Sequence, residues 1–180
     1  MKKDLNVTIE IPEGVSANLE GDTLTIKGKE GEITRRFKFG RVNATLVGNK
    51  LTLGNEKSTK TEKKLMNTIA AHIENMIKGV QEKFVYELKI CFGHFPFTVK
   101  KEGNKAIIKN FLGEKVDRVV NLTAGTDVEI DKNMIFVKSV NKELAGNCSA
   151  KFEAATKIRG RDKRIFQDGI YIIKKNGKEI

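Results

Sequence analysis

The chain contains one sequence pattern twice, and this duplication limits the folds that it can adopt. Residues 20–36 align with residues 102–118 at a constant shift of 82, without a gap and with seven identical residues in seventeen positions. Farther along, a shift of 84 places Lys132-Asn133 on Gly48-Asn49, and apolar residues alternate on both sides of each pair. Unrelated stretches would not keep these matches in the same order, so the chain is predicted to fold as two copies of one unit.

Alternating apolar residues open the first copy and predict short strands with one buried face. Residues 7–11 alternate apolar and polar side chains, and Gly48-Asn49 marks a hairpin turn because both residue types tolerate a positive φ. From Thr59 onward the apolar residues recur at helical spacing. Thr59 and Glu62 fit a capping box at the start of this helix, and Gly79 is predicted to form a left-handed C-cap at its end.

The second copy repeats this order of elements and ends in a helix predicted over about residues 141–157, with Gly160 after it. One face of each helix is apolar and should cover a sheet. The predicted fold class is α+β: a tandem duplication of a small antiparallel β-sheet unit with one helix packed on a face, plus a C-terminal basic arm. We expect an N-terminal α+β repeat over residues 1–81 and a C-terminal α+β repeat over residues 82–160. The basic arm, residues 161–180, should be packed on or extend from the second repeat.

Basic residues gather toward the C-terminal end of the chain. Residues 151–180 carry nine cations and four acids, a net +5 out of +11 for the whole chain, whereas residues 1–80 carry 14 cations and 10 acids, a net +4. Seven cations at and after the predicted end of the second helix are the candidate RNA-binding residues: Lys157, Arg159, Arg161, Lys163, Arg164, Lys174 and Lys175. Such a cluster can also be a solvated surface that keeps a protein soluble. Its concentration in one short segment favours a polyanionic partner, and above all nucleic acid.

Several classes of function lack the residues that they need. No apolar run approaches the ~20 residues needed to span a bilayer, and the N-terminus has no signal-peptide core, so we expect a cytoplasmic protein with no membrane partner. Cys91 and Cys148 are far apart and lack metal-ligand spacing, and we expect two buried free thiols. Phosphate-binding glycine loops and hydrolase motifs are also missing. We therefore expect no catalytic residue, metal, cofactor or small-molecule substrate.

Two further segments allow more than one interpretation. His94 stands in Cys-Phe-Gly-His-Phe-Pro-Phe directly after a predicted strand, and the sequence places no acid or nucleophile beside it. A structural or RNA-stacking role is favoured over catalysis, and His94 joins the RNA-binding candidates. Phe111-Leu112 lies in a strand connection and can form a contact surface or fold back onto the sheet. Folding back is favoured because large aromatic side chains are usually buried.

Motifs spread over almost the full length resemble those of one family. They are Ile11-Pro12-Glu13 with Val15, Asn75-Met76-Ile77-Lys78-Gly79-Val80, His94-Phe95-Pro96, Asn110-Phe111-Leu112-Gly113-Glu114-Lys115, and Arg164-Ile165-Phe166-Gln167-Asp168-Gly169-Ile170-Tyr171. Together they make the chain resemble ribosomal protein six of the large subunit, a universal family, in the form shared by archaea and eukaryotes.

This resemblance implies a non-enzymatic structural constituent of the large ribosomal subunit that supports translation in the cytoplasmic ribosome. It also implies binding to large-subunit rRNA near the base of the factor-recruiting stalk, beside neighbouring large-subunit proteins, with the second half as the principal RNA-binding half. The bacterial branch ends in a Pro-Glu-Pro-Tyr-Lys-Gly-Lys-Gly type tail that this chain lacks, so the RNA contacts of that tail do not transfer. The alternative from another class is a free-standing nucleic-acid-binding or regulatory protein.

Overall fold

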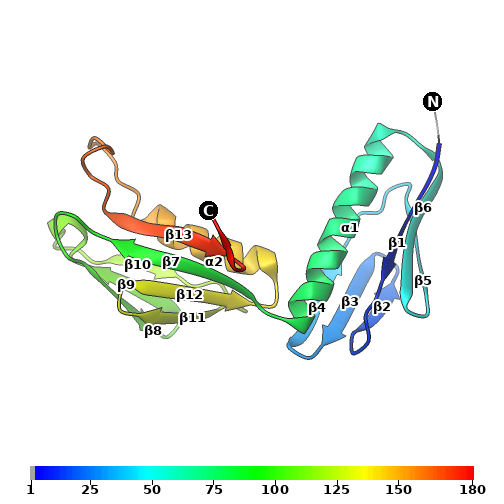
Figure 1. Cartoon of the computed structure of the whole chain (residues 1–180), viewed down its shortest axis with the longest axis horizontal. Coiled ribbons are helices and arrows are strands. Elements are labelled where there is room, and N and C mark those ends of the chain that lie inside the picture. The colour runs from blue at the N-terminus through cyan, green and yellow to red at the C-terminus, as the bar shows by residue number, and fades with distance from the viewer. Residues whose placement is uncertain (1–2) are drawn as a thin grey trace. The chain divides into compact units, whose positions relative to one another are not determined.

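Two compact units make up the structure, a computed structural model that describes residues 3–180. The units divide after Lys83, so that unit 1 precedes this point and unit 2 is Phe84–Ile180. Each unit combines antiparallel sheets with one helix (Figure 1). The first two residues of the predicted 1–81 repeat lie outside the described range. No helix in residues 3–180 is long and apolar enough to cross a membrane.

Unit 1 contains two three-stranded antiparallel sheets. The first has the order β1-β6-β5 and the second has the order β2-β3-β4. These strands are β1 (Lys3–Glu10), β2 (Ser16–Glu20), β3 (Thr23–Gly28), β4 (Gly31–Arg36), β5 (Asn43–Val47) and β6 (Lys50–Ser58). In the ladders Ile9 lies opposite Leu51 and Ile26 lies opposite Ile33, and these four side chains are all buried. The alternation in the sequence thus places one side of each strand in the core.

Helix α1 (Lys60–Gln81) packs on the sheets of unit 1. The sequence predicted the residues that cap its start but not the residue at which it ends. The capping box of Thr59 and Glu62 is confirmed. The predicted C-cap at Gly79 is wrong, because the helix continues to Gln81 and Gly79 is buried within it. At this end the Val80 carbonyl accepts a hydrogen bond from the backbone N–H of Glu30 at 2.9 Å. The β3–β4 turn therefore satisfies a terminal carbonyl that a glycine cap would otherwise have had to satisfy.

Unit 2 repeats the same topology, so the predicted α+β duplication is confirmed. Strands β7, β12 and β11 correspond to β1, β6 and β5, and β8, β9 and β10 correspond to β2, β3 and β4. Their bounds are β7 (Phe84–Cys91), β8 (Thr98–Glu102), β9 (Lys105–Lys109), β10 (Arg118–Asn121), β11 (Asp127–Asp131) and β12 (Met134–Ser139), followed by helix α2 (Lys142–Ala155). Each unit differs from the expectation of one small sheet, because its strands divide between two sheets.

Residues 161–180, expected as an arm, contain a strand that has no counterpart among residues 3–83, the described part of unit 1. Strand β13 (Gly169–Lys175) pairs with the edge of β7 that β12 leaves open, and a turn leads to β14 (Lys178–Glu179). Residues 161–168, the turn at 176–177 and the last residue, Ile180, remain outside helices and strands. The strand forms because Ile170 is buried in the core and the free backbone groups of β7 gain partners.

The cores contain the apolar residues that the helical spacing indicated, with Ile73 of α1 and Phe152 of α2 fully buried. Phe111 folds back and is buried, as favoured from the sequence. Cys148 is a buried free thiol as predicted, whereas Cys91 is only partly buried because it ends β7. Phe152 near the end of α2 and Ile170 near the beginning of β13 belong to the same core of unit 2.

Candidate nucleic-acid interface

A basic loop, residues 156–168, connects α2 to β13 and carries five of the seven predicted cations. Helix α2 ends at Ala155, two residues earlier than expected, because Thr156 leaves the helix to hold the base of the loop. Its hydroxyl accepts a hydrogen bond from the backbone N–H of Ile170 at 2.9 Å and lies 3.2 Å from the carbonyl of Phe152. The two ends of the basic loop are therefore joined. Its five cations are all exposed: Lys157, Arg159, Arg161, Lys163 and Arg164.

A turn centred on Asp162 shapes the tip of the basic loop. The Asp162 carboxylate accepts a hydrogen bond from the backbone N–H of Arg164 at 2.9 Å, and its carbonyl accepts one from Phe166 at 2.9 Å. The Arg164 side chain also lies 3.3 Å from the same carboxylate. In the described part of the chain, Lys157, Arg159 and Lys163 form no ion pair. The single acid of the tip is thus satisfied within the turn, and most of the positive charge faces outward.

Aromatic contacts attach the basic loop to the loop after β7. The ring of Phe166 stacks on His94 with centroids 4.5 Å apart and planes 17° apart, and the Arg161 guanidinium lies 4.8 Å from the centroid of Phe166. His94 therefore lies beside the predicted cations. One face of the His94 ring stacks on Phe166, so His94 helps to hold the basic loop, and it stays an RNA-binding candidate.

A buried carboxylate that the sequence prediction missed, that of Asp168, completes this attachment. Its side chain is 1% exposed and lies 2.6 Å from the Nδ1 atom of His94. It also accepts hydrogen bonds from the backbone N–H groups of Gly93 at 2.7 Å and His94 at 3.0 Å. Burial raises the pKa of Asp168, but the hydrogen bonds from His94 and Gly93 outweigh burial and hold the pKa below its usual value. The sequence signal was indirect: His94 and Asp168 belong to two separate family motifs.

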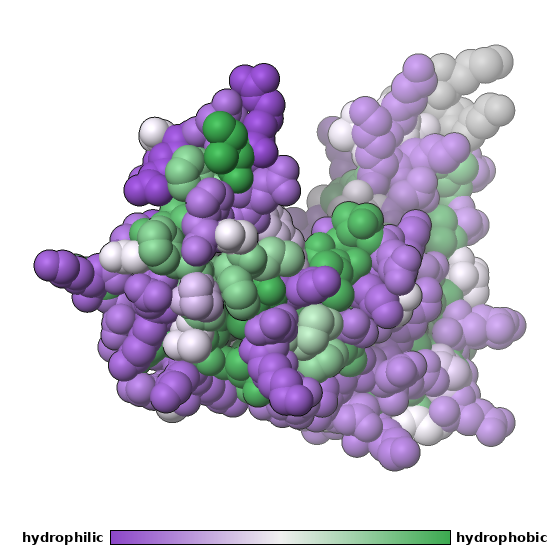
Figure 2. All heavy atoms as spheres, turned by 60° about the vertical axis from the view of Figure 1, so that its left-hand side comes forward, coloured by the Kyte–Doolittle hydropathy of each residue, from purple (hydrophilic) through white to green (hydrophobic). Residues whose placement is uncertain are grey.

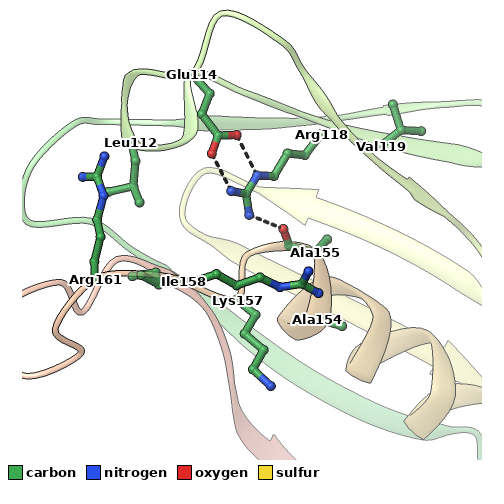
Figure 3. Close-up of a pocket in the computed structure, with 10 residues that line it drawn as sticks. Leu112, Glu114, Arg118, Val119, Ala154, Ala155, Lys157, Ile158 and Arg161 are labelled. Atoms are coloured by element: carbon green, nitrogen blue, oxygen red, sulfur yellow. Dashed lines mark hydrogen bonds and ion pairs between the residues drawn. The ribbon is translucent and has the colours of Figure 1, made fainter.

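A basic groove of about 600 Å³ lies beside the loop (Figure 3). Four cations line it, Arg118, Lys157, Arg159 and Arg161, together with one acid, Glu114. Arg118 donates to both carboxylate oxygens of Glu114 at 2.7 and 2.5 Å and to the carbonyl of Ala155 at 2.7 Å. The hydrogen bond from Arg118 is the main reason that the pKa of Glu114 lies below its usual value, and the charge of Arg161 adds to it. The only acid in the groove is thus ionised and paired, which leaves the groove positively charged.

The structure separates Lys174 and Lys175 from the other candidates. In the ladder Gly169 lies opposite Cys91 and Lys174 lies opposite Glu87, four residues earlier on β7, so Lys174 is about 13 Å along the sheet from the start of β13. Lys174 also lies 3.9 Å from Glu87 and 4.0 Å from Glu179. These two lysines therefore do not belong to the cluster of the basic loop.

Among residues 3–180, no group of three or more His, Cys, Asp or Glu side chains could hold a metal ion.

Comparison with known proteins gives the family of the chain. The model of the family described as "Ribosomal protein L6" matches residues 11–83. The large ribosomal subunit protein uL6 of Methanosarcina mazei is 42% identical over 97% of this chain and 99% of its own length. The uL6 proteins of Methanobrevibacter smithii and Archaeoglobus fulgidus are also 42% identical, over 93% of this chain and over 94% and 88% of their own lengths. These relatives cover both units, and the chain belongs to the ribosomal protein L6 family.

Proposed function

We propose that the chain is a structural constituent of the large ribosomal subunit and that unit 2 binds large-subunit rRNA through the basic loop. The relatives named as large ribosomal subunit proteins match nearly the whole chain, which supports a place in that subunit. The observation that carries the RNA contact is the basic loop itself, with five exposed cations on one closed connection. The position near the base of the factor-recruiting stalk rests on the family resemblance.

The geometry of the basic loop suits a phosphate backbone. Arg159, Arg161 and Arg164 each present a planar fork of donors that matches two phosphate oxygens, and the lysines add point charges. The groove beside the loop extends this surface with Arg118. The nearby acids do not oppose a polyanion strongly, because Asp162 and Glu114 are held by arginines and Asp168 is buried. Neighbouring large-subunit proteins are the expected protein partners, and the cytoplasmic ribosome is the expected location.

Ultraviolet crosslinking in cells, followed by sequencing of the attached RNA, tests this function. We expect crosslinks to one region of large-subunit rRNA, and we expect the chain to sediment with large subunits after a high-salt wash. Scattered crosslinks to many RNAs, together with release from subunits in high salt, would instead support a free-standing nucleic-acid-binding protein. A variant with Arg161, Lys163 and Arg164 changed to alanine should lose most of the crosslinks, because these cations form the tip of the loop.

A further inference from the structure

A small cleft lies where the basic loop meets the loop after β7. It has a volume of about 260 Å³ and is lined by Cys91, Phe92, Gly93, His94, Ile165, Gln167 and Asp168. This volume lies just below the ~300–1,000 Å³ range of pockets for drug-sized molecules, so the cleft suits a smaller group such as one flat ring system. The hydrogen bonds of Asp168 to Gly93 and His94 join its two walls and fix their separation.

The walls of this cleft expose large apolar side chains, which is unusual in this chain. Phe92 is 42% exposed, and it and Phe95 are the only two of the ten phenylalanines that are exposed. Across the cleft, Ile165 at the tip of the basic loop is 65% exposed. Figure 2 brings forward the end of unit 2 that carries the basic loop, and apolar side chains are exposed there between hydrophilic ones. An apolar surface at this position suits a partner that is itself partly apolar.

Contacts with the core hold the ring of Phe92 in place. It meets Phe97 edge to face with centroids 6.2 Å apart, and Phe97 in turn meets Phe111 at 5.2 Å. Phe97 and Phe111 are both buried. A ring that is held at one edge and exposed elsewhere loses little conformational entropy when a planar group stacks on it.

The charges around the cleft select the chemistry of the partner. Arg164 directly precedes Ile165, and Arg161 contacts Phe166, whose ring stacks on His94 in the cleft wall. The only carboxylate in the lining, that of Asp168, is buried and hydrogen-bonded. A partner that combines a flat apolar group with a closely attached anion fits these features, and a nucleotide combines both.

We propose that this cleft binds one unpaired base of RNA, stacked on Phe92 and opposite Ile165, while the adjoining phosphates contact Arg161 and Arg164. The Gln167 side-chain nitrogen donates to the Arg164 carbonyl at 3.3 Å, and its second N–H and its oxygen can meet the base edge. This proposal rests on the proposed function and adds to it a contact with a base, which depends on stacking, beside the phosphate contacts, which depend on charge.

Chemical probing of transcribed large-subunit rRNA tests the proposal, with dimethyl sulfate for unpaired adenine and cytosine and with a carbodiimide for unpaired uracil and guanine. We compare the full chain with Phe92→Leu, which keeps the apolar volume but loses the aromatic face, and with Phe92→Tyr, which keeps that face. The wild type and Phe92→Tyr should protect one unpaired base. Phe92→Leu should leave this base reactive and bind about 5- to 100-fold more weakly. The salt dependence of its binding should not change, because no cation is lost.

A second variant and a control complete the experiment. Ile165→Ala alters the opposite wall at a highly exposed position and should also leave the base reactive, whereas Val47→Ala, an exposed apolar position in unit 1, should behave like the wild type. Wild-type affinity and protection in both Phe92→Leu and Ile165→Ala would overturn the proposal and leave the proposed function intact. Unchanged RNA contacts with loss of a neighbouring protein from the subunit would show that the cleft is a protein-docking surface. Failure of the wild type to bind the rRNA would overturn the proposed function and this proposal together.

Discussion

At the scale of single residues, Asp168 determines where the basic loop lies. Its carboxylate holds Gly93 and His94, and His94 carries the ring of Phe166. The pKa of Asp168 is lower in the folded chain than the value of about 4 expected in the unfolded chain. Ionised Asp168 therefore stabilises unit 2 above about pH 4, and this contribution is lost as the pH falls through the folded-state pKa.

We expect Asp168→Asn to lower the free energy of unfolding by about 1–3 kcal/mol at pH 7, because charge-assisted hydrogen bonds are lost. The variant should also lose less stability than the wild type when the pH falls below about 4. Urea unfolding followed by tyrosine fluorescence measures this, since the chain has no tryptophan and its two tyrosines, Tyr86 and Tyr171, lie in unit 2. Asp162→Asn, at an exposed position of the same loop, is the control and should change stability by less than about 0.5 kcal/mol. Equal unfolding curves for the two variants at both pH values would contradict this role of Asp168.

The residue scale also shows which parts of the site the sequence could predict. The cations of the basic loop were found because they lie close together in the sequence, and local clustering of charge needs no knowledge of the fold. Asp168 was missed because its partners Gly93 and His94 are 75 and 74 residues away. Arg118 was missed for the same reason, since the carbonyl that it binds belongs to Ala155 in another element.

At the scale of elements, β13 changes the expected role of the C-terminal segment. A peripheral arm would contribute little to stability, but β13 pairs with β7 and places Ile170 in the core. Helix α2 supports the same strand, because Glu153 accepts a hydrogen bond from the backbone N–H of Ile172 at 3.0 Å. The repeat could not predict β13, because the described residues of unit 1 contain no equivalent strand. A local signal was present in Asn176-Gly177, a pair typical of tight hairpins, and both residues have a positive φ.

Substitutions at two isoleucines that are five residues apart test whether β13 contributes to the stability of unit 2. Ile170→Ala in β13 should lower the free energy of unfolding of unit 2 by about 2–5 kcal/mol, because it leaves a cavity in the core. Ile165→Ala in the basic loop removes the same atoms from an exposed side chain and should cost less than about 0.5 kcal/mol. Urea unfolding followed by tyrosine fluorescence compares the two variants. Similar midpoints would show that β13 is as peripheral as the sequence suggested.

At the scale of the whole molecule, duplication gives each unit its own core. The sequence predicted this organisation well, because two copies of one pattern must each bury an apolar face. It did not predict that each copy divides its strands between two sheets, since alternation defines the buried face of a strand but not its neighbour. The core of unit 2 is built from residues between Phe84 and Ile172.

The separate cores predict separate effects of two core substitutions. Phe152→Ala should lower the free energy of unfolding of unit 2 by about 3–5 kcal/mol and shift the tyrosine-detected transition. Ile73→Ala should cost about 2–5 kcal/mol in unit 1 and leave that transition in place, because Ile73 is not part of the core of unit 2. Circular dichroism, which detects both units, should reveal the loss from Ile73→Ala. A tyrosine transition that shifts equally in both variants would show that the two cores do not act separately.

The salt dependence of rRNA binding tests the central claim most directly, namely that the basic loop anchors the protein on RNA. If the five loop cations meet phosphates, log affinity should fall with log salt at a slope of about −4, which is about a 250-fold loss between 50 and 200 mM. Changing Arg161, Lys163 and Arg164 to alanine should flatten this slope by about 2–3, since each lost contact removes its counterion release. The matched control changes Arg36, Lys38 and Arg41 to alanine, three exposed cations of unit 1 with the same residue types. We predict a slope near that of the wild type for this control, and equal slopes for the two triple variants would contradict the account.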